Sequence, residues 1–488
     1  MASTRIPIAF LALASVAFAQ PPAAPKKPVT DVYQGVSVTD DYRWLENYSD
    51  PDVRAWTESE NSYARKYLDA LPQRAAIADE LKKLYSQPSP HYDSLHAAGG
   101  LLFALKHQPP KEQPLLVALK SADDPASERV ILDPNQLDAS GGTEIDFYVP
   151  SLDGKLVAVS LSKGGSESGD VHVYDVSTGK ETGAPIPRVN GGTAGGSLAW
   201  NADGSGFYYT RYPHEGERPP ADLTFYQQVY FHRMGTDPSL DAYSLGKGFP
   251  RIAEIQLHTS DDGRYMLATM ANGDGGDFAH YVLGPDGTWH QVARISDQVA
   301  SIRFGADGNL YLLSHLNAPR GKILKTPASR PNVEAAQTAI PESRVAIQDF
   351  LPTPKALYVL DQIGGPSQIR IFDPSGAAQG TIPLLPISAV DDMVRSNDGA
   401  LLFENTSFLD PPAWYRFDVE TKQAKRTALY ETGAADFSDS EVTRLFAISK
   451  DGTRIPLSII RRKGTKLDGK NPALLTAYGG YDVNITPD

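Results

Sequence analysis

One short segment near residue 480 has the composition of an active-site turn. The apolar run from Pro472 to Ala477 has the length of a buried strand, and Tyr478, Gly479 and Gly480 follow it directly. In an open α/β sheet, the carboxyl end of a central strand opens into the loops that build active sites. A tyrosine phenol in such a loop can donate a hydrogen bond to an oxyanion. An ordinary glycine turn beside a core tyrosine would have the same sequence, so both interpretations stay open here.

The other candidate sites favour structural explanations. Asn272–Asp277 has carboxylates at a spacing that could bind calcium, but the later glutamate of an EF-hand loop is missing, which favours a solvated loop. The glycine-rich run Gly164–Asp170 has neither the lysine nor the following helix of a phosphate site. Histidines such as His172 and His280 lie in strand-like runs, where packing or surface roles are typical. We therefore expect no metal and no cofactor.

Composition and charge exclude further classes of protein. The formal net charge is -13, and no basic run is longer than Arg461–Lys463, so a nucleic acid partner is not expected. The absence of cysteine excludes disulfides, thiolate metal ligands and a cysteine nucleophile. With 488 residues, of which 41% are hydrophobic, the chain is expected to form two domains or one large repeat array.

The first nineteen residues have the pattern of a secretory signal. Arg5 precedes an apolar stretch from Ile6 to Val16, and Ala17–Ala19 has the small-x-small form of a signal-peptidase site. The stretch is short for a membrane span and contains Pro7, which disfavours a retained anchor. We therefore predict cleavage after Ala19, a secreted or periplasmic location, and no membrane association once the signal is removed.

Residues 20–85 are predicted to form a helical segment. Asp50 is a suitable N-cap and Pro51 a suitable first helical residue, and apolar side chains then recur at mostly three- and four-residue spacing from Val53 to Leu71. A second amphipathic stretch, from Ile77 to Tyr85, ends before Pro88. The aromatic stripe of these helices is expected to be part of a core.

After residue 86 the pattern changes to short strand-like runs, each preceded by an Asp-Gly turn. The turns recur at intervals of about 45 to 60 residues, with one final gap of about twice that length. They are Asp153-Gly154, Asp203-Gly204, Asp262-Gly263, Asp307-Gly308 and Asp398-Gly399. In the long gap, Pro352–Lys355 followed by Ala356–Leu360 has the features of the same hairpin with different turn residues. Asp286-Gly287 falls between two of the regular turns and is interpreted as a further hairpin within one unit.

This period is typical of a β-propeller. Four short strands per unit and about 50 residues per unit over residues 86–436 predict seven blades, although six or eight are also compatible with the spacing. A β-sandwich would account for the turns but not for their period. From residue 437 the sequence predicts a hairpin, Val442–Ile448 and Ile455–Ile460 around Asp451-Gly452, followed by a loop and the apolar run before Tyr478. That order fits the antiparallel beginning of an α/β-hydrolase sheet.

Taken together, these segments resemble the prolyl oligopeptidase family of serine peptidases along nearly the whole chain after the signal. The matching segments are Asp41–Glu46 with Trp56 and Glu60-Asn61, Leu132–Asn135, Ala199–Gly204 with Phe207-Tyr208, Val229–His232 before Gly235–Asp237, Ser449–Gly452 with Ile455-Pro456, and Pro472–Pro487. The resemblance implies a seven-bladed β-propeller inserted into an α/β-hydrolase domain, of which residues 20–85 and 437–488 would be parts.

The resemblance also implies an activity and two site residues. The family cleaves short peptides on the carboxyl side of proline, and its propeller restricts entry to oligopeptides. By position in the motif, Tyr478 would donate its hydroxyl to the oxyanion. Tyr481 would line the proline pocket, where the family commonly has phenylalanine. The full-length protein is expected to be a monomer that acts on oligopeptides.

The sequence departs from the family in its catalytic residues. No Gly-x-Ser-x-Gly segment occurs, and all 10 histidines lie between His91 and His315, within the predicted propeller. The serine, aspartate and histidine of the family would lie beyond residue 488. Because a serine nucleophile needs a base within hydrogen-bond reach, the chain is predicted to be an inactive N-terminal fragment. The alternative is a secreted, non-catalytic propeller that binds peptides or a partner protein.

Overall fold

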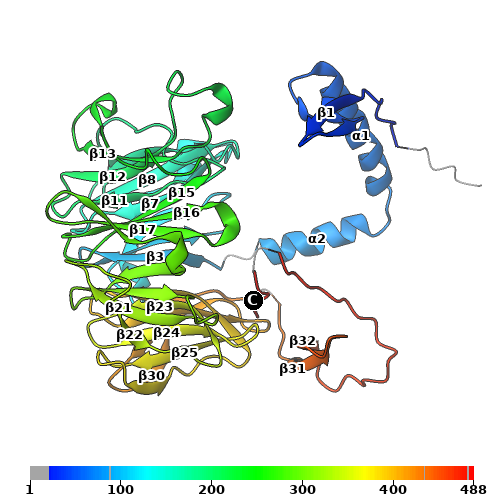
Figure 1. Cartoon of the computed structure of the whole chain (residues 1–488). Coiled ribbons are helices and arrows are strands. Elements are labelled where there is room, and N and C mark those ends of the chain that lie inside the picture. The colour runs from blue at the N-terminus through cyan, green and yellow to red at the C-terminus, as the bar shows by residue number, and fades with distance from the viewer. Residues whose placement is uncertain (1–20, 87–88, 434, 481–482, 488) are drawn as a thin grey trace, which may run out of the picture. The chain divides into compact units, whose positions relative to one another are not determined.

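The structure is a computed structural model that describes residues 21–86, 89–433, 435–480 and 483–487. The predicted signal peptide lies outside these residues. The chain divides after Ser86 into two units, which are described separately below and drawn in Figure 1. None of the helices formed by the described residues combines the length and the apolar character needed to cross a membrane.

The N-terminal unit consists of one hairpin and two helices. Strands β1 (Val29–Tyr33) and β2 (Val36–Asp40) pair antiparallel, and α1 (Pro51–Asp69) and α2 (Arg74–Tyr85) follow. The predicted cap is confirmed, because an Asp50 carboxylate oxygen accepts a hydrogen bond of 2.8 Å from the Asp52 amide. Both helices form where they were expected.

The expected core position of the helical stripe is not confirmed. In α1 only Val53 is buried, and α2 buries no residue. Leu68 and Leu81 are among the large apolar side chains that remain exposed. The two helices and the hairpin therefore do not enclose a core of their own, because an amphipathic helix buries its apolar face only against another apolar surface.

The second unit contains seven four-stranded antiparallel sheets, which confirms the predicted seven-bladed propeller. The first three blades are β3 (His91–Ala98), β4 (Leu101–His107), β5 (Leu115–Leu119) and β6 (Arg129–Leu132); β7 (Thr143–Pro150), β8 (Leu156–Lys163), β9 (Asp170–Asp175) and β10 (Lys180–Glu181); and β11 (Leu198–Trp200), β12 (Gly206–Arg211), β13 (Gln228–Arg233) and β14 (Ala242–Leu245). The fourth and fifth are β15 (Ala253–Thr259), β16 (Met266–Asn272), β17 (Phe278–Leu283) and β18 (Trp289–Ala293); and β19 (Val299–Phe304), β20 (Asn309–Ser314), β21 (Lys322–Pro327) and β22 (Gln337–Ile340). The last two are β23 (Ala346–Pro352), β24 (Leu357–Gln362), β25 (Ser367–Phe372) and β26 (Ala378–Thr381); and β27 (Ser388–Arg395), β28 (Leu401–Ser407), β29 (Ala413–Asp418) and β30 (Gln423–Tyr430).

Short helical turns and one further hairpin complete the described elements. The turns are η1 (Arg43–Glu46), η2 (Pro125–Ser127), α3 (Pro134–Leu137), η3 (Pro220–Asp222), η4 (Pro238–Leu240), η5 (Gly273–Gly275) and η6 (Ile295–Asp297). Strands β31 (Ser440–Ile448) and β32 (Arg454–Arg462) form a two-stranded sheet after the propeller. The hairpin predicted around Asp451-Gly452 is this pair.

The repeated Asp-Gly turns have the role that their spacing predicts. Each of the five joins the first and second strands of a blade, and the turn around Pro352–Lys355 occupies the same place between β23 and β24. At Asp153 the carboxylate accepts hydrogen bonds from the Ser151 hydroxyl, at 2.8 Å, and from the Lys155 amide, at 3.1 Å. Gly154 has φ +68°, in the left-handed region that glycine adopts without strain. The aspartate and the glycine thus stabilise the turn by different means.

Neighbouring blades are held together by alternate side chains of their strands. In β4, Leu102 and Ala104 contact the seventh blade, whereas Phe103 and Leu105 contact the second. This alternation follows from the two-residue period of a strand, and it buries both faces of a blade. Hydrophobic clusters occupy all seven junctions between blades. The inner strands of a blade therefore have nearly continuous apolar sequences.

The ring closes between the seventh blade and the first without a shared strand, since each blade takes all four strands from one continuous stretch of chain. Trp414 is 1% exposed at this seam, and its indole N–H donates a 2.7 Å hydrogen bond to the Tyr92 carbonyl. The Asn397 side-chain amide donates to the Leu101 carbonyl at 2.9 Å. Closure therefore depends on packing and a few hydrogen bonds around one buried indole.

We expect the Trp414→Ala substitution to lower the free energy of unfolding by about 3 to 5 kcal/mol, because it leaves a cavity at the seam. Urea unfolding followed by circular dichroism measures the change. The control is Leu240→Ala, whose side chain is 75% exposed and whose loss should cost less than about 0.5 kcal/mol. Equal transition midpoints for the two variants would contradict a seam held by this indole.

Candidate functional site

The apolar run before Tyr478 does not form the predicted buried strand. Residues 463–480 contain turns and extended backbone but no strand, and Leu474 and Leu475 are 97% and 81% exposed. The prediction is wrong for this chain for a physical reason. A central strand needs a neighbour on each side to bond its N–H and C=O groups, and in the described residues β31 and β32 pair only with each other.

Tyr478 is therefore presented to solvent. Its side chain is 58% exposed and is not packed in an interior. The phenol is accessible to a partner group, but its role as an oxyanion donor stays a prediction. Tyr481, predicted to line a proline pocket, lies outside the described residues, so its role also stays a prediction.

The region after the propeller contacts one turn of the sixth blade. The Arg444 guanidinium donates to the carbonyl of Gly364 at 3.0 Å and to that of Ile363. A Cβ atom on Gly365 would lie 3.3 Å from the Ile485 carbonyl oxygen, and Gly365 has φ +117°. Both contacts are to the turn between β24 and β25. In a four-stranded blade this turn lies on the face where the chain enters and leaves, opposite the Asp-Gly turns.

A cavity of about 340 Å³ lies among the first strands of four consecutive blades. It is lined by side chains that include His96 of β3, Tyr148 of β7 and His258 of β15. Burial, and then the nearby His258, lowers the pKa of His96 to about 4, so this imidazole is neutral at pH 7. The Tyr148 ring packs edge-on against His96 with the ring centroids 5.1 Å apart. Since first strands are the innermost strands of a propeller, this cavity borders its central channel.

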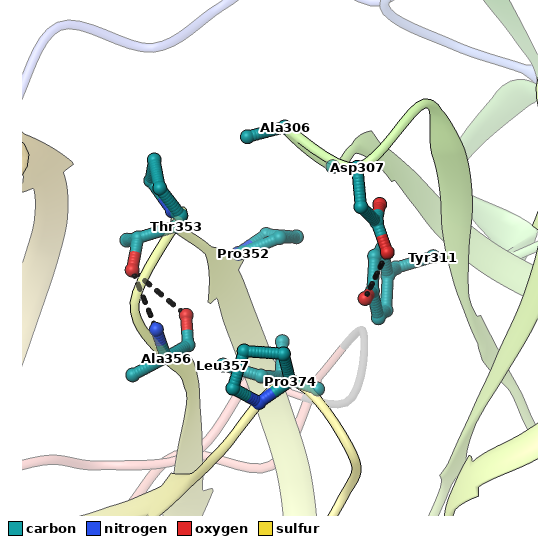
Figure 2. A pocket seen from close by; sticks show the side chains of 10 residues that line it. Ala306, Asp307, Tyr311, Pro352, Thr353, Ala356, Leu357 and Pro374 are labelled. Atoms are coloured by element: carbon teal, nitrogen blue, oxygen red, sulfur yellow. Dashed lines mark hydrogen bonds between the residues drawn. The ribbon is translucent and has the colours of Figure 1, made fainter.

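A smaller pocket lies between the fifth and sixth blades, at the Asp-Gly turn face (Figure 2). It has a volume of about 160 Å³ and is bordered by the Asp307 turn and by Pro352 and Pro374. The Asp307 carboxylate accepts hydrogen bonds from the Tyr311 hydroxyl, at 3.1 Å, and from Lys325, at 2.7 Å. The Asp307 carboxylate is thus already paired with Tyr311 and Lys325, which indicates a structural role.

A buried carboxylate at the seam was not anticipated from the sequence. Glu404 of β28 is 8% exposed and, by alternation with Leu402, faces the first blade. A β-bulge in β27 places Asp391 and Asp392 opposite it. Burial, and then the charge of Asp391, raises the pKa of Glu404 to about 8. The signal available in the sequence was a glutamate directly after the apolar run Leu401–Phe403, because a strand buried on both faces has no solvated side.

Within the described ranges, no group of three or more histidine and carboxylate side chains is arranged to hold a metal ion. In the Asn272–Asp277 segment, Gly273–Gly275 form the short turn η5, and Asp274 and Asp277 are exposed. The arrangement is that of a solvated loop between β16 and β17.

Residues 21–428 match the family described as prolyl oligopeptidase, N-terminal beta-propeller domain. This chain belongs to the prolyl oligopeptidase family. A prolyl endopeptidase of Elizabethkingia meningoseptica is 28% identical over 494 residues, an alignment that covers 96% of this chain and 65% of that relative. Prolyl oligopeptidase A of Galerina marginata (strain CBS 339.88) is 24% identical, with 96% and 68% covered. The chain thus spans somewhat less than two thirds of the first of these relatives.

Solved structures of the family share the fold. A chain from a structural and mechanistic study of two prolyl endopeptidases superposes with a TM-score of 0.86 at 25% identity, covering 96% of this chain and 68% of that chain. Prolyl oligopeptidase B from Galerina marginata, bound to a 25-residue macrocyclization substrate, superposes with a TM-score of 0.78 at 22% identity. This second likeness concerns the fold alone.

We expect hydrogen exchange to separate the propeller from the segment that carries Tyr478. Amides of residues 472–480 should exchange within the shortest labelling time because no strand ladder protects them, whereas amides of β8 should exchange slowly. The β31–β32 hairpin serves as the internal control, since it is paired but only two strands wide. Slow exchange at Leu474 and Leu475 would contradict the exposed arrangement.

The raised pKa of Glu404 predicts how stability depends on pH. The folded chain holds this proton more tightly than the unfolded chain, whose glutamate has its ordinary pKa of 4.5. The resulting stabilisation is present below that value and is lost as the pH rises toward 8. Glu404→Gln does not titrate, so its thermal midpoint relative to the original chain should rise between pH 5 and pH 8. A difference that is constant with pH would contradict the raised pKa.

Proposed function

We propose that this chain is the propeller-bearing part of a serine endopeptidase that cleaves short peptides after proline. The observation that carries the proposal is the family match over residues 21–428, which spans both the helical N-terminal segment and the propeller. The topology supports it. Each blade has four strands, so the chain enters at β3 and leaves at β30 on the same face. That face is the one from which Arg444 and Ile485 contact the sixth blade.

In the proposed reaction the residues of this chain select and bind the peptide and stabilise the oxyanion, but none of them attacks the peptide bond. The propeller restricts access to peptides thin enough to reach the site. Tyr478 donates its hydroxyl to the oxyanion of the tetrahedral intermediate, and Tyr481 offers a flat apolar face to the proline ring. The serine, aspartate and histidine must come from outside residues 1–488, because the sequence has no Gly-x-Ser-x-Gly segment and its histidines end at His315.

The proposal also covers the cellular location and the oligomeric state of the enzyme. The pattern of residues 1–19 supports export, so the substrates would be oligopeptides outside the cytoplasm or in the periplasm. The full-length enzyme would act as a monomer. The comparisons with prolyl endopeptidases support the substrate class, since those relatives are named for cleavage at proline.

We expect purified residues 20–488 to show no proline-specific cleavage of a chromogenic peptide, because the groups that would generate the oxyanion are missing. Release of the chromophore, measured spectrophotometrically over hours, checks this. Turnover that a serine-directed inhibitor abolishes would overturn the expectation.

The coding DNA beyond the Asp488 codon provides the complementary test. A continuation with Gly-x-Ser-x-Gly and a late histidine supports the proposal, and the extended protein should then cleave after proline. In that protein, Tyr478→Phe should lower kcat by about 10² to 10³, with little change in KM, if the phenol stabilises only the transition state. A stop codon at that place would favour the binding-propeller alternative.

A further inference from the structure

A pocket of about 390 Å³ lies beside the seam of the propeller. Its acidic side chains are Glu404, Asp391 and Asp410, with His91 of β3 beside Glu404. Its apolar wall comes from the β28–β29 turn and from the segment after the propeller, and comprises Phe408, Leu409, Pro411, Pro412 and Phe437. The pocket therefore combines the buried carboxyl group of Glu404 with an apolar surface.

The Glu404 side chain is poised for a partner that the described residues do not supply. It is 8% exposed, and its Oε1 atom has no hydrogen bond to any described group. Its nearest basic neighbour is the His91 Nε2 atom, at 4.0 Å. Burial lowers the pKa of His91, which leaves that imidazole neutral at pH 7. Native proteins rarely leave a buried carboxylate oxygen without a donor, because the lost hydration is costly.

The charges around Glu404 are of one sign. Asp391 and Asp392 face it from β27, Asp93 from β3, and Glu431 from the end of β30. The Asp93 carboxylate is already paired with the His107 Nε2 atom at 2.7 Å. The surroundings therefore disfavour an ionised Glu404 unless a cation enters the pocket.

We propose that this pocket binds an alkylammonium or guanidinium group carried on an apolar stem. The charged head donates to Glu404, and the stem lies against the apolar wall. A metal ion does not fit as well, since the described residues provide no set of three ligands. The same chemistry is offered by a lysine or arginine side chain of a peptide and by a free aliphatic amine. The proposal does not depend on peptidase activity.

Binding should be linked to release of a proton. Without a ligand, Glu404 is largely protonated at pH 7, because its pKa is raised to about 8. An ammonium group binds the carboxylate form, so the affinity should fall about fivefold from pH 8 to pH 7, about tenfold for each further pH unit below 7, and level off above pH 8. A neutral ligand of the same shape would show neither effect.

Isothermal titration calorimetry on the whole chain tests the proposal, with butylammonium and butylguanidinium as probes and butanol as the neutral isostere. We expect the cations to bind, butanol to bind at least tenfold more weakly, and the affinity to fall about fivefold from pH 8 to pH 7. Titrations in two buffers of different ionisation enthalpy should show a proton released on binding. Equal binding of butanol, or no binding of either cation, would overturn the proposal.

Two variants sharpen the test. Glu404→Gln should lose at least tenfold in affinity together with the pH dependence. The control is Glu420→Gln, the same change at a 73% exposed site in the β29–β30 turn of the same blade, and it should bind as the original chain does. Unchanged binding by Glu404→Gln would overturn the proposal. If that variant does not fold, the proton release from the original chain decides the outcome.

Two peptides distinguish the sources of the cation. Acetyl-Gly-Lys-Gly-amide is compared with the peptide that has norleucine in place of lysine. Binding of the lysine peptide alone, as tight as butylammonium or tighter, assigns the pocket to basic peptide side chains. Binding of butylammonium without either peptide assigns it to free amines. Equal binding of the two peptides would contradict recognition through charge.

Discussion

An even number of strands in every blade constrains the whole second unit. Four antiparallel strands return the chain to the face at which it entered, so β3 starts and β30 ends on one side of the ring. The segment after the propeller contacts that face, where Arg444 binds the β24–β25 turn. The Asp-Gly turns lie on the opposite face of the ring.

At the seam between the seventh blade and the first, a buried indole, a buried carboxyl group and the proposed binding pocket lie side by side. Because the first and seventh blades share no strand, packed side chains and a few hydrogen bonds hold the seam, and Trp414 is its largest buried member. Glu404 lies on the neighbouring strand, directly across from Trp414 in the register. A buried carboxyl group without a fixed cation therefore lies where no strand ladder joins the blades. Occupancy of the adjacent pocket would therefore stabilise this junction, since a bound cation stabilises the folded chain by mass action.

The blades were predictable because their signals are local. An aspartate that caps its own turn and a glycine with positive φ act within a few residues, so Asp153-Gly154 forms the same hairpin wherever the blade lies. The same holds for Asp50 at the start of α1. The candidate site was less predictable. Tyr478 could be singled out by its type and its place after an apolar run, but its surroundings depend on strands that the described residues do not provide.

The sequence by itself determined the period and the family resemblance, and it favoured seven blades over six or eight, because turn chemistry and strand alternation are properties of short segments; the structure fixed the number at seven. Tertiary structure alone decided which residues meet at the seam. It brought Glu404 beside His91 and left the run before Tyr478 exposed. The physical reason is that burial and charge are shared between distant segments: a carboxylate becomes costly, and an apolar run becomes a strand, only through the neighbours that the fold supplies.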